Sequence, residues 1–284
     1  MIDTHAHLDG EEFRDDLPAV IQRAREAGVE KVFIPAIDLA TSQLIPQLCS
    51  QYPGYLYPMA GLHPEEVRAD WREVLQEIKL ALPQESAPSA DSNQMPLPEG
   101  GVGDGPLAIG EVGLDFYWSR EFEQEQLLAF EEQVRWSVVT RLPLMIHCRK
   151  AQNEMVKMLR RYEKDLPGGV FHCFTGNAHE AAELLQFQRF VLGIGGVLTF
   201  KKSHLPEVLT TVPVDRVVLE TDAPYMAPVP MRGKRNESSF VKYVLLRMAE
   251  CYNMSPEDLA AITTQTVRRV FPRFDETFQA AKLK

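Results

Sequence analysis

The chain has 284 residues, of which 45% are hydrophobic and 25% charged, and its formal net charge is −10. This composition is typical of a globular protein with a sizeable core and excludes a fibrous or mainly disordered chain. No run approaches the roughly 20 apolar residues of a membrane span. Because so acidic a surface repels a long nucleic-acid duplex, a phosphate-bearing partner would have to be captured locally.

Cysteine usage and the N-terminus indicate the compartment. The four cysteines are scattered along the chain, which predicts no disulfide framework. The first residues show neither a basic segment nor an apolar leader segment. From that absence we expect a cytoplasmic protein with no membrane association, and the sequence indicates no obligate protein partner.

Short apolar, β-branched runs alternate with longer segments of helical periodicity, and eight of these runs are predicted strands. They are Met1–Thr4, Lys31–Ile37, Leu56–Gly61, Leu107–Val112, Leu144–His147, Val170–Cys173, Phe190–Ile194 and Val217–Glu220. Amphipathic stretches such as Glu121–Thr140 separate them. Parallel strands with helical crossovers, eight in number, predict an α/β fold: a TIM-type (β/α)8 barrel formed by residues 1–284 as one domain.

Two features qualify this architecture. From about Glu237 onward, two further helical patterns predict extra C-terminal helices on the outside of the barrel. The segment Pro83–Pro106 holds five prolines, four glycines and no basic residue, which predicts a long surface insertion. An open doubly wound sheet is the alternative fold, but it usually has a Gly-rich turn after its first strand, where His-Ala-His stands here.

Ligand-type residues stand at the ends of five predicted strands, and in a β/α barrel these ends meet at one face. They are His5, His7, Glu111, His147, His172 and Asp222. Residues two apart on a strand share a face, so His5 and His7 can offer two imidazoles to one ion, and Glu111 could bridge two ions. This mixed N/O set suits Zn²⁺, Mn²⁺ or similar divalent ions, and two ions about 3.5 to 4 Å apart would support a hydrolysis.

Seven motifs carry a family resemblance and follow one another from residue 1 to about residue 240. They are MIDTHAHLD, GLHPEE, AIGEVGLDFYW, LPLMIHCRKA, VFHCFTGN, ETDAPYMAP and RGKRNE. Together they resemble the TatD family of metal-dependent deoxyribonucleases, within the wider amidohydrolase-like barrel group. The resemblance implies two divalent metal ions (Mg²⁺, Mn²⁺ or Zn²⁺) and hydrolysis of phosphodiester bonds in DNA.

The resemblance also implies a role for each matching residue. His5, His7, Glu111 and Asp222 would hold one ion, whereas Glu111, His147 and His172 would hold the other. Asp222 and Glu111 would be the catalytic residues, with Asp222 as the base that activates water. His63 and Arg149 fall at positions near the substrate phosphate. The chain departs from the family pattern at Ser238-Ser239 and at Met231, which affects substrate contacts rather than the ligand set.

Other residues of the same loops could add to substrate binding. Basic side chains follow the fifth and eighth predicted strands, namely Arg149, Lys150, Arg232, Lys234 and Arg235, and would either capture phosphate or form a solvated loop. Tyr117 and Trp118 would either stack on a base or pack against the insertion.

Three functions are consistent with these patterns. The first is a nuclease that acts on single-stranded DNA or strand ends. In this function a metal-bound hydroxide attacks the phosphorus of the phosphodiester. The second keeps both ions but hydrolyses a small amide, ester or aminoacyl substrate, because a fold does not determine its substrate. The third is a catalytically silent barrel that serves as a scaffold, which a degenerate ligand set would support, whereas this set is complete.

Overall fold

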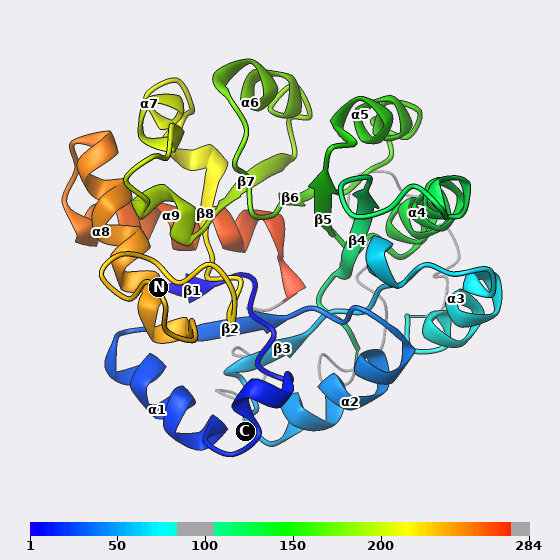
Figure 1. Cartoon of the computed structure of the whole chain (residues 1–284), viewed down its shortest axis with the longest axis horizontal. Helices are drawn as coiled ribbons and strands as arrows, with labels where there is room; N and C mark the ends of the chain where they lie inside the picture. The colour runs from blue at the N-terminus through cyan, green and yellow to red at the C-terminus, as the bar shows by residue number, and fades with distance from the viewer. Residues whose placement is uncertain (84–104, 274–284) are drawn as a thin grey trace, which may run out of the picture.

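The structure is a computed structural model that describes residues 1–83 and 105–273 (Figure 1). All eight predicted strands form, although most are shorter than expected. They are β1 (Ile2–Asp3), β2 (Lys31–Ile34), β3 (Leu56–Pro58), β4 (Ile109–Asp115), β5 (Leu144–Arg149), β6 (Gly169–Phe171), β7 (Phe190–Ile194) and β8 (Val217–Leu219). Only β4 and β5 continue past their predicted carboxyl ends, and both extensions carry polar residues of the site described below.

The strands form a ring of two parallel sheets, in the orders β1-β2-β3 and β4-β5-β6-β7-β8. One junction is a parallel bridge between Ala60 and Ile109. At the other, Ala6 bridges to Ala223, and the Thr4 amide donates to the Leu219 carbonyl oxygen at 3.1 Å. Strand order in the ring is therefore strand order in the chain, which is the topology of a (β/α)8 barrel and confirms the predicted fold class over the doubly wound alternative.

Helices surround the ring, as Figure 1 shows. They are α1 (Leu17–Glu26), α2 (Leu39–Ser50), α3 (Trp71–Lys79), α4 (Glu123–Thr140), α5 (Gln152–Arg160), α6 (Ala178–Leu184), α7 (Leu205–Leu209), α8 (Val241–Tyr252) and α9 (Pro256–Val270). The stretch predicted as a helix from Glu121 becomes α4, which begins two residues later. None of these helices in the described residues combines the length and the apolar composition needed to cross a membrane.

The inside of the ring is filled with side chains. Every strand contributes an inward-facing apolar residue, or has one directly before it, as in Phe33, Met145 and Val218. Val270 at the end of α9 and the adjacent Phe271 join the same cluster. The two predicted C-terminal helices are present as α8 and α9, and the apolar end of α9 covers the interior of the barrel. The insertion at Pro83–Pro106 lies almost entirely outside the described residues.

Candidate functional site

The segments that follow β1 and β8 are hydrogen-bonded to each other beside the site. The Asp222 amide donates to the His5 carbonyl oxygen at 2.9 Å, and the His7 amide donates to the Ala223 carbonyl oxygen at 2.7 Å. Asp222 itself has a φ of 56°, a left-handed conformation that aspartate tolerates better than most residues. His5 and His7 lie just beyond β1 rather than on it, and this backbone pairing places them next to Asp222.

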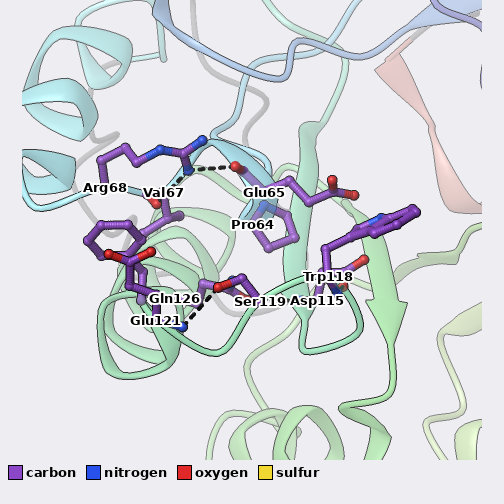
Figure 2. Close-up of a pocket in the computed structure, with 10 residues that line it drawn as sticks. Pro64, Glu65, Val67, Arg68, Asp115, Trp118, Ser119, Glu121 and Gln126 are labelled. Atoms are coloured by element: carbon purple, nitrogen blue, oxygen red, sulfur yellow. Dashed lines mark hydrogen bonds between the residues drawn. The ribbon is translucent and has the colours of Figure 1, made fainter.

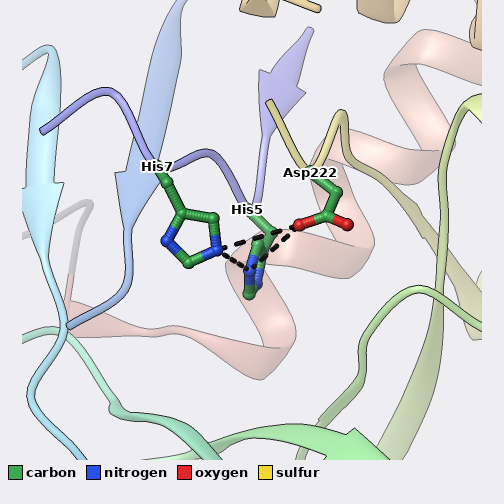
Figure 3. A group of neighbouring side chains, drawn as sticks. All are labelled: His5, His7 and Asp222. Atoms are coloured by element: carbon green, nitrogen blue, oxygen red, sulfur yellow. Dashed lines mark hydrogen bonds and ion pairs between the residues drawn. The ribbon is translucent and has the colours of Figure 1, made fainter. Parts of the chain in front are cut away.

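A first group of side chains presents four donor atoms to one point. The Nε2 atoms of His5 and His7 are 3.2 Å apart, and Glu111 Oε2 lies 3.2 Å from the first and 3.4 Å from the second. Asp222 Oδ1 lies 3.8 Å from both nitrogens (Figure 3). An ion bound tetrahedrally at about 2.1 Å has ligands about 3.4 Å apart, so this group fits a divalent cation.

A second group of donors surrounds the other oxygen of Glu111. Oε1 lies 2.7 Å from His172 Nε2 and 3.0 Å from His147 Nδ1, and these two nitrogens are 3.4 Å apart. Glu111 is buried and offers one oxygen to each group. The six predicted ligand residues thus lie in two adjacent groups that share the Glu111 carboxylate, a mixed N/O set suited to Zn²⁺ or Mn²⁺. Two further candidate groups overlap them at His147, one with His63 and Glu111 and one with Glu65 and Asp115.

The electrostatics of these groups are strongly coupled. Burial disfavours the ionised form of Glu111, but the surrounding imidazoles outweigh it and hold its pKa well below the usual range. Burial lowers the pKa of His5 well below its ordinary value. For His7 and His147 burial acts in the same direction, but the neighbouring carboxylates dominate and raise the pKa of each to about 9. Protons and divalent cations therefore compete for the same nitrogen atoms.

The two predicted substrate residues lie at the rim of the second group. His63 Nδ1 accepts a hydrogen bond from the Glu65 amide at 3.1 Å, so Nε2 carries the ring proton and faces Glu111 Oε1 at 3.3 Å. In this tautomer His63 is a hydrogen-bond donor rather than a ligand. Arg149 lies two residues after His147 at the exposed end of β5 and therefore on the same face of the strand.

Asp115 lies beside the candidate ligand His147 but was not predicted as a site residue from the sequence. Its Oδ2 lies 2.9 Å from His147 Nε2, the ring nitrogen that faces away from Glu111. A carboxylate that accepts from Nε2 leaves the Nδ1 lone pair directed at the second group, an arrangement that orients metal-ligating histidines. The sequence signal for Asp115 was the Asp of the AIGEVGLDFYW motif. It was not used because the predicted strand ended at Val112, three residues before it. A register shift between Ile109 and Val112 lets β4 continue to Asp115.

Gly113 permits this close pairing of β4 with β5. Its φ is 143°, and a Cβ atom there would collide with the carbonyl oxygen of His147. A side chain at this position would push apart the two strands that carry Glu111 and His147, so the glycine is a structural requirement of the site.

We expect Asp115→Asn to weaken binding of a divalent ion by about 10- to 100-fold, because the amide no longer fixes the tautomer and orientation of His147. Titration calorimetry with Zn²⁺ or Mn²⁺ measures this directly and needs no turnover. Asp215→Asn, at an exposed carboxylate distant from the site, is the matched control. Unchanged affinity in the Asp115 variant would contradict the assigned role.

The two arginines of the RGKRNE motif make structural contacts. Arg235 donates to both carboxylate oxygens of Asp16, at 2.9 and 2.8 Å. Arg232 donates to the Ala227 carbonyl oxygen at 2.9 Å and stacks on Phe200. These two arginines therefore hold the loop after β8 in place, and phosphate capture by them stays a prediction.

Comparisons with known proteins found relatives that match nearly the whole chain. The family model described as TatD related DNase matches residues 2–272. An uncharacterized metal-dependent hydrolase, YabD of Bacillus subtilis, is 35% identical over 95% of this chain and 98% of its own length. A protein of Citrobacter rodentium named 3'-5' ssDNA/RNA exonuclease TatD is 32% identical, over 95% and 97%. The crystal structure of YJJV, a TatD homolog from Escherichia coli, superposes with a TM-score of 0.81 at 26% identity and covers 96% of this chain and 98% of its own.

Proposed function

The chain belongs to the family of TatD-related DNases and is a metal-dependent hydrolase of phosphodiester bonds; from that premise we propose that it degrades DNA from single strands or strand ends. The observation that carries the proposal is that the two oxygens of Glu111 each face a separate pair of histidine nitrogens. Two adjacent cation sites are the arrangement that phosphodiester cleavage uses to stabilise the attacking and the departing oxygen. The related protein named as a single-strand exonuclease supports the choice of substrate.

In this proposal His5, His7, Glu111 and Asp222 hold one divalent ion, and Glu111, His147 and His172 hold the second. When bound, such ions would act as Lewis acids on the phosphoryl oxygens and activate water as a nucleophile. Four nitrogen donors and two carboxylates admit Zn²⁺, Mn²⁺ or Mg²⁺, in that order of suitability for the softer imidazole set.

The side chains of the chain itself position the substrate and move the proton. Asp222 accepts a proton from the attacking water, and burial supports this because it raises the pKa of the carboxyl group and makes the carboxylate a stronger base. His63 Nε2–H donates to a phosphoryl oxygen. The Arg149 guanidinium pairs with the phosphate of a neighbouring nucleotide, because its fork geometry matches two phosphate oxygens.

The test is hydrolysis of end-labelled single-stranded DNA by metal-stripped protein, with Mg²⁺, Mn²⁺ or Zn²⁺ restored separately. We expect no cleavage by the stripped protein and stepwise shortening from one end after an ion is restored. Duplex DNA, RNA and small amides or esters are tested beside it. Cleavage of only the small substrates, with ions shown to be bound, would contradict the proposed nuclease activity.

A further inference from the structure

The loop that follows β4 exposes two aromatic side chains at the rim of the site. Trp118 is 66% exposed and Tyr117 is 50% exposed, so neither packs into the core. Their rings meet edge to face with centroids 4.9 Å apart. Exposure of such large apolar rings to water is unfavourable in free energy, and a ligand that covers the rings removes this apolar surface from water.

Arg149 completes this surface from the neighbouring strand. Its guanidinium carbon lies 3.7 Å from the ring centroid of Tyr117 and 5.1 Å from that of Trp118. Within residues 1–83 and 105–273 no carboxylate lies within 4.0 Å of this guanidinium, and its longer-range interaction with the Glu65 carboxylate leaves its charge accessible to an anion. An aromatic pair beside an available arginine is the combination that binds single-stranded nucleic acid, with bases on the rings and phosphates on the cation.

Asp115 connects this surface rigidly to the candidate metal groups. One of its carboxylate oxygens faces His147 Nε2 at 2.9 Å, while the other accepts from the Tyr117 amide at 2.8 Å and the Trp118 amide at 3.4 Å. The same carboxylate thus orients a ligand residue and the backbone that carries both aromatic residues.

A pocket of about 300 Å³ opens next to Trp118, between the 115–122 loop and the short 3-10 helix Pro64–Glu66 (Figure 2). The pocket has apolar walls at Pro64 and Phe122, and its charged groups are the Arg68 guanidinium and the carboxylates of Glu65, Asp115 and Glu121. Small-molecule sites commonly combine apolar walls with a few polar groups in this way. The pocket provides space for a base that extends beyond the edge of the Trp118 ring.

From these observations we infer that Trp118, Tyr117 and Arg149 form a stacking subsite for one unpaired nucleobase of the substrate. The inference rests on the proposed function and adds to it the residues that recognise a single strand. A base can reach the rings only when it is not paired, so this subsite selects single strands and frayed ends over an intact duplex. Stacking is tolerant of base identity, which fits a nuclease without strong sequence preference.

Binding without turnover provides the first test. The chain has three tryptophans, of which Trp71 and Trp136 are only 7% and 3% exposed, so quenching of intrinsic fluorescence reports on Trp118. Titration of the protein in EDTA with a short single-stranded oligonucleotide is expected to quench this emission, and a matched duplex is expected to quench it much less. Equal quenching by both, or none by either, would overturn the inference.

Turnover provides the second test, with single-stranded substrates that differ by one base. One oligonucleotide carries normal bases, and the other carries an abasic residue at the cleaved end. We expect Trp118→Ala to reduce kcat/KM about tenfold on the normal substrate and much less on the abasic one, and Trp118→Phe to restore most of the loss. Leu246→Ala, an exposed apolar residue of α8, is the control.

Two results would overturn the subsite. Trp118→Ala could cleave the normal substrate as fast as the wild type, or it could lose equal activity on both substrates. If no variant cleaves either substrate with any ion, the proposed nuclease activity is refuted and the stacking subsite is not. In that case the fluorescence titration alone tests whether an unpaired base binds at Trp118.

Discussion

Replacing Glu111 by glutamine is expected to abolish phosphodiester hydrolysis and to release divalent ions from the protein. Glu111 is the one residue that contributes an oxygen to both donor groups, with nitrogens at 2.7 to 3.4 Å from its two oxygens. Metal ions supply several kcal/mol of transition-state stabilisation, and each 1.4 kcal/mol or so is tenfold in rate. We therefore expect kcat/KM to fall by roughly 10³-fold or more.

The measurement pairs single-strand hydrolysis with the metal content of the protein after dialysis. Glu207→Gln removes an equally charged but 83% exposed carboxylate of α7 and serves as the matched control. Far-UV circular dichroism shows whether the Glu111 variant keeps the barrel. A folded Glu111→Gln variant with wild-type turnover would disprove the shared-carboxylate assignment.

Replacing Asp222 by asparagine is expected to reduce kcat by about 10²- to 10⁴-fold, the usual contribution of a general base. The effect on ion binding should be smaller than for Glu111. Asp222 Oδ1 lies 3.8 Å from the imidazole nitrogens, farther than the Glu111 oxygen, and an asparagine oxygen can still act as a neutral ligand. The expected signature is a large loss of kcat with a small change in KM.

This second prediction is checked by steady-state kinetics on single-stranded DNA at saturating ion, beside calorimetric titration of the same ion. A large loss of ion binding with proportionate loss of activity would make Asp222 a ligand only. Retention of kcat with intact ion binding would exclude Asp222 as the base.

The local sequence was sufficient to predict the fold and to indicate which side chains lie together at the candidate site. Strand periodicity located all eight strands, because a strand buried on both faces is a continuous apolar run wherever it occurs. The barrel topology then predicted that His5, His7, Glu111 and Asp222 lie at one face, because the carboxyl ends of all strands meet there. Assignment of those residues as ligands and base stays a prediction that the variants above test.

Tertiary structure decided what depends on contacts between distant segments. Asp115 entered the site because a register shift lets β4 continue beside β5, and a shift in pairing leaves no periodic trace in the sequence. Arg235 was one of the basic residues that could capture phosphate, and the structure shows that its guanidinium contacts Asp16, a residue near the other end of the chain. The residue types of the chain thus determined which chemistry is possible, whereas the partner of each charged side chain was determined only when strands and loops packed together.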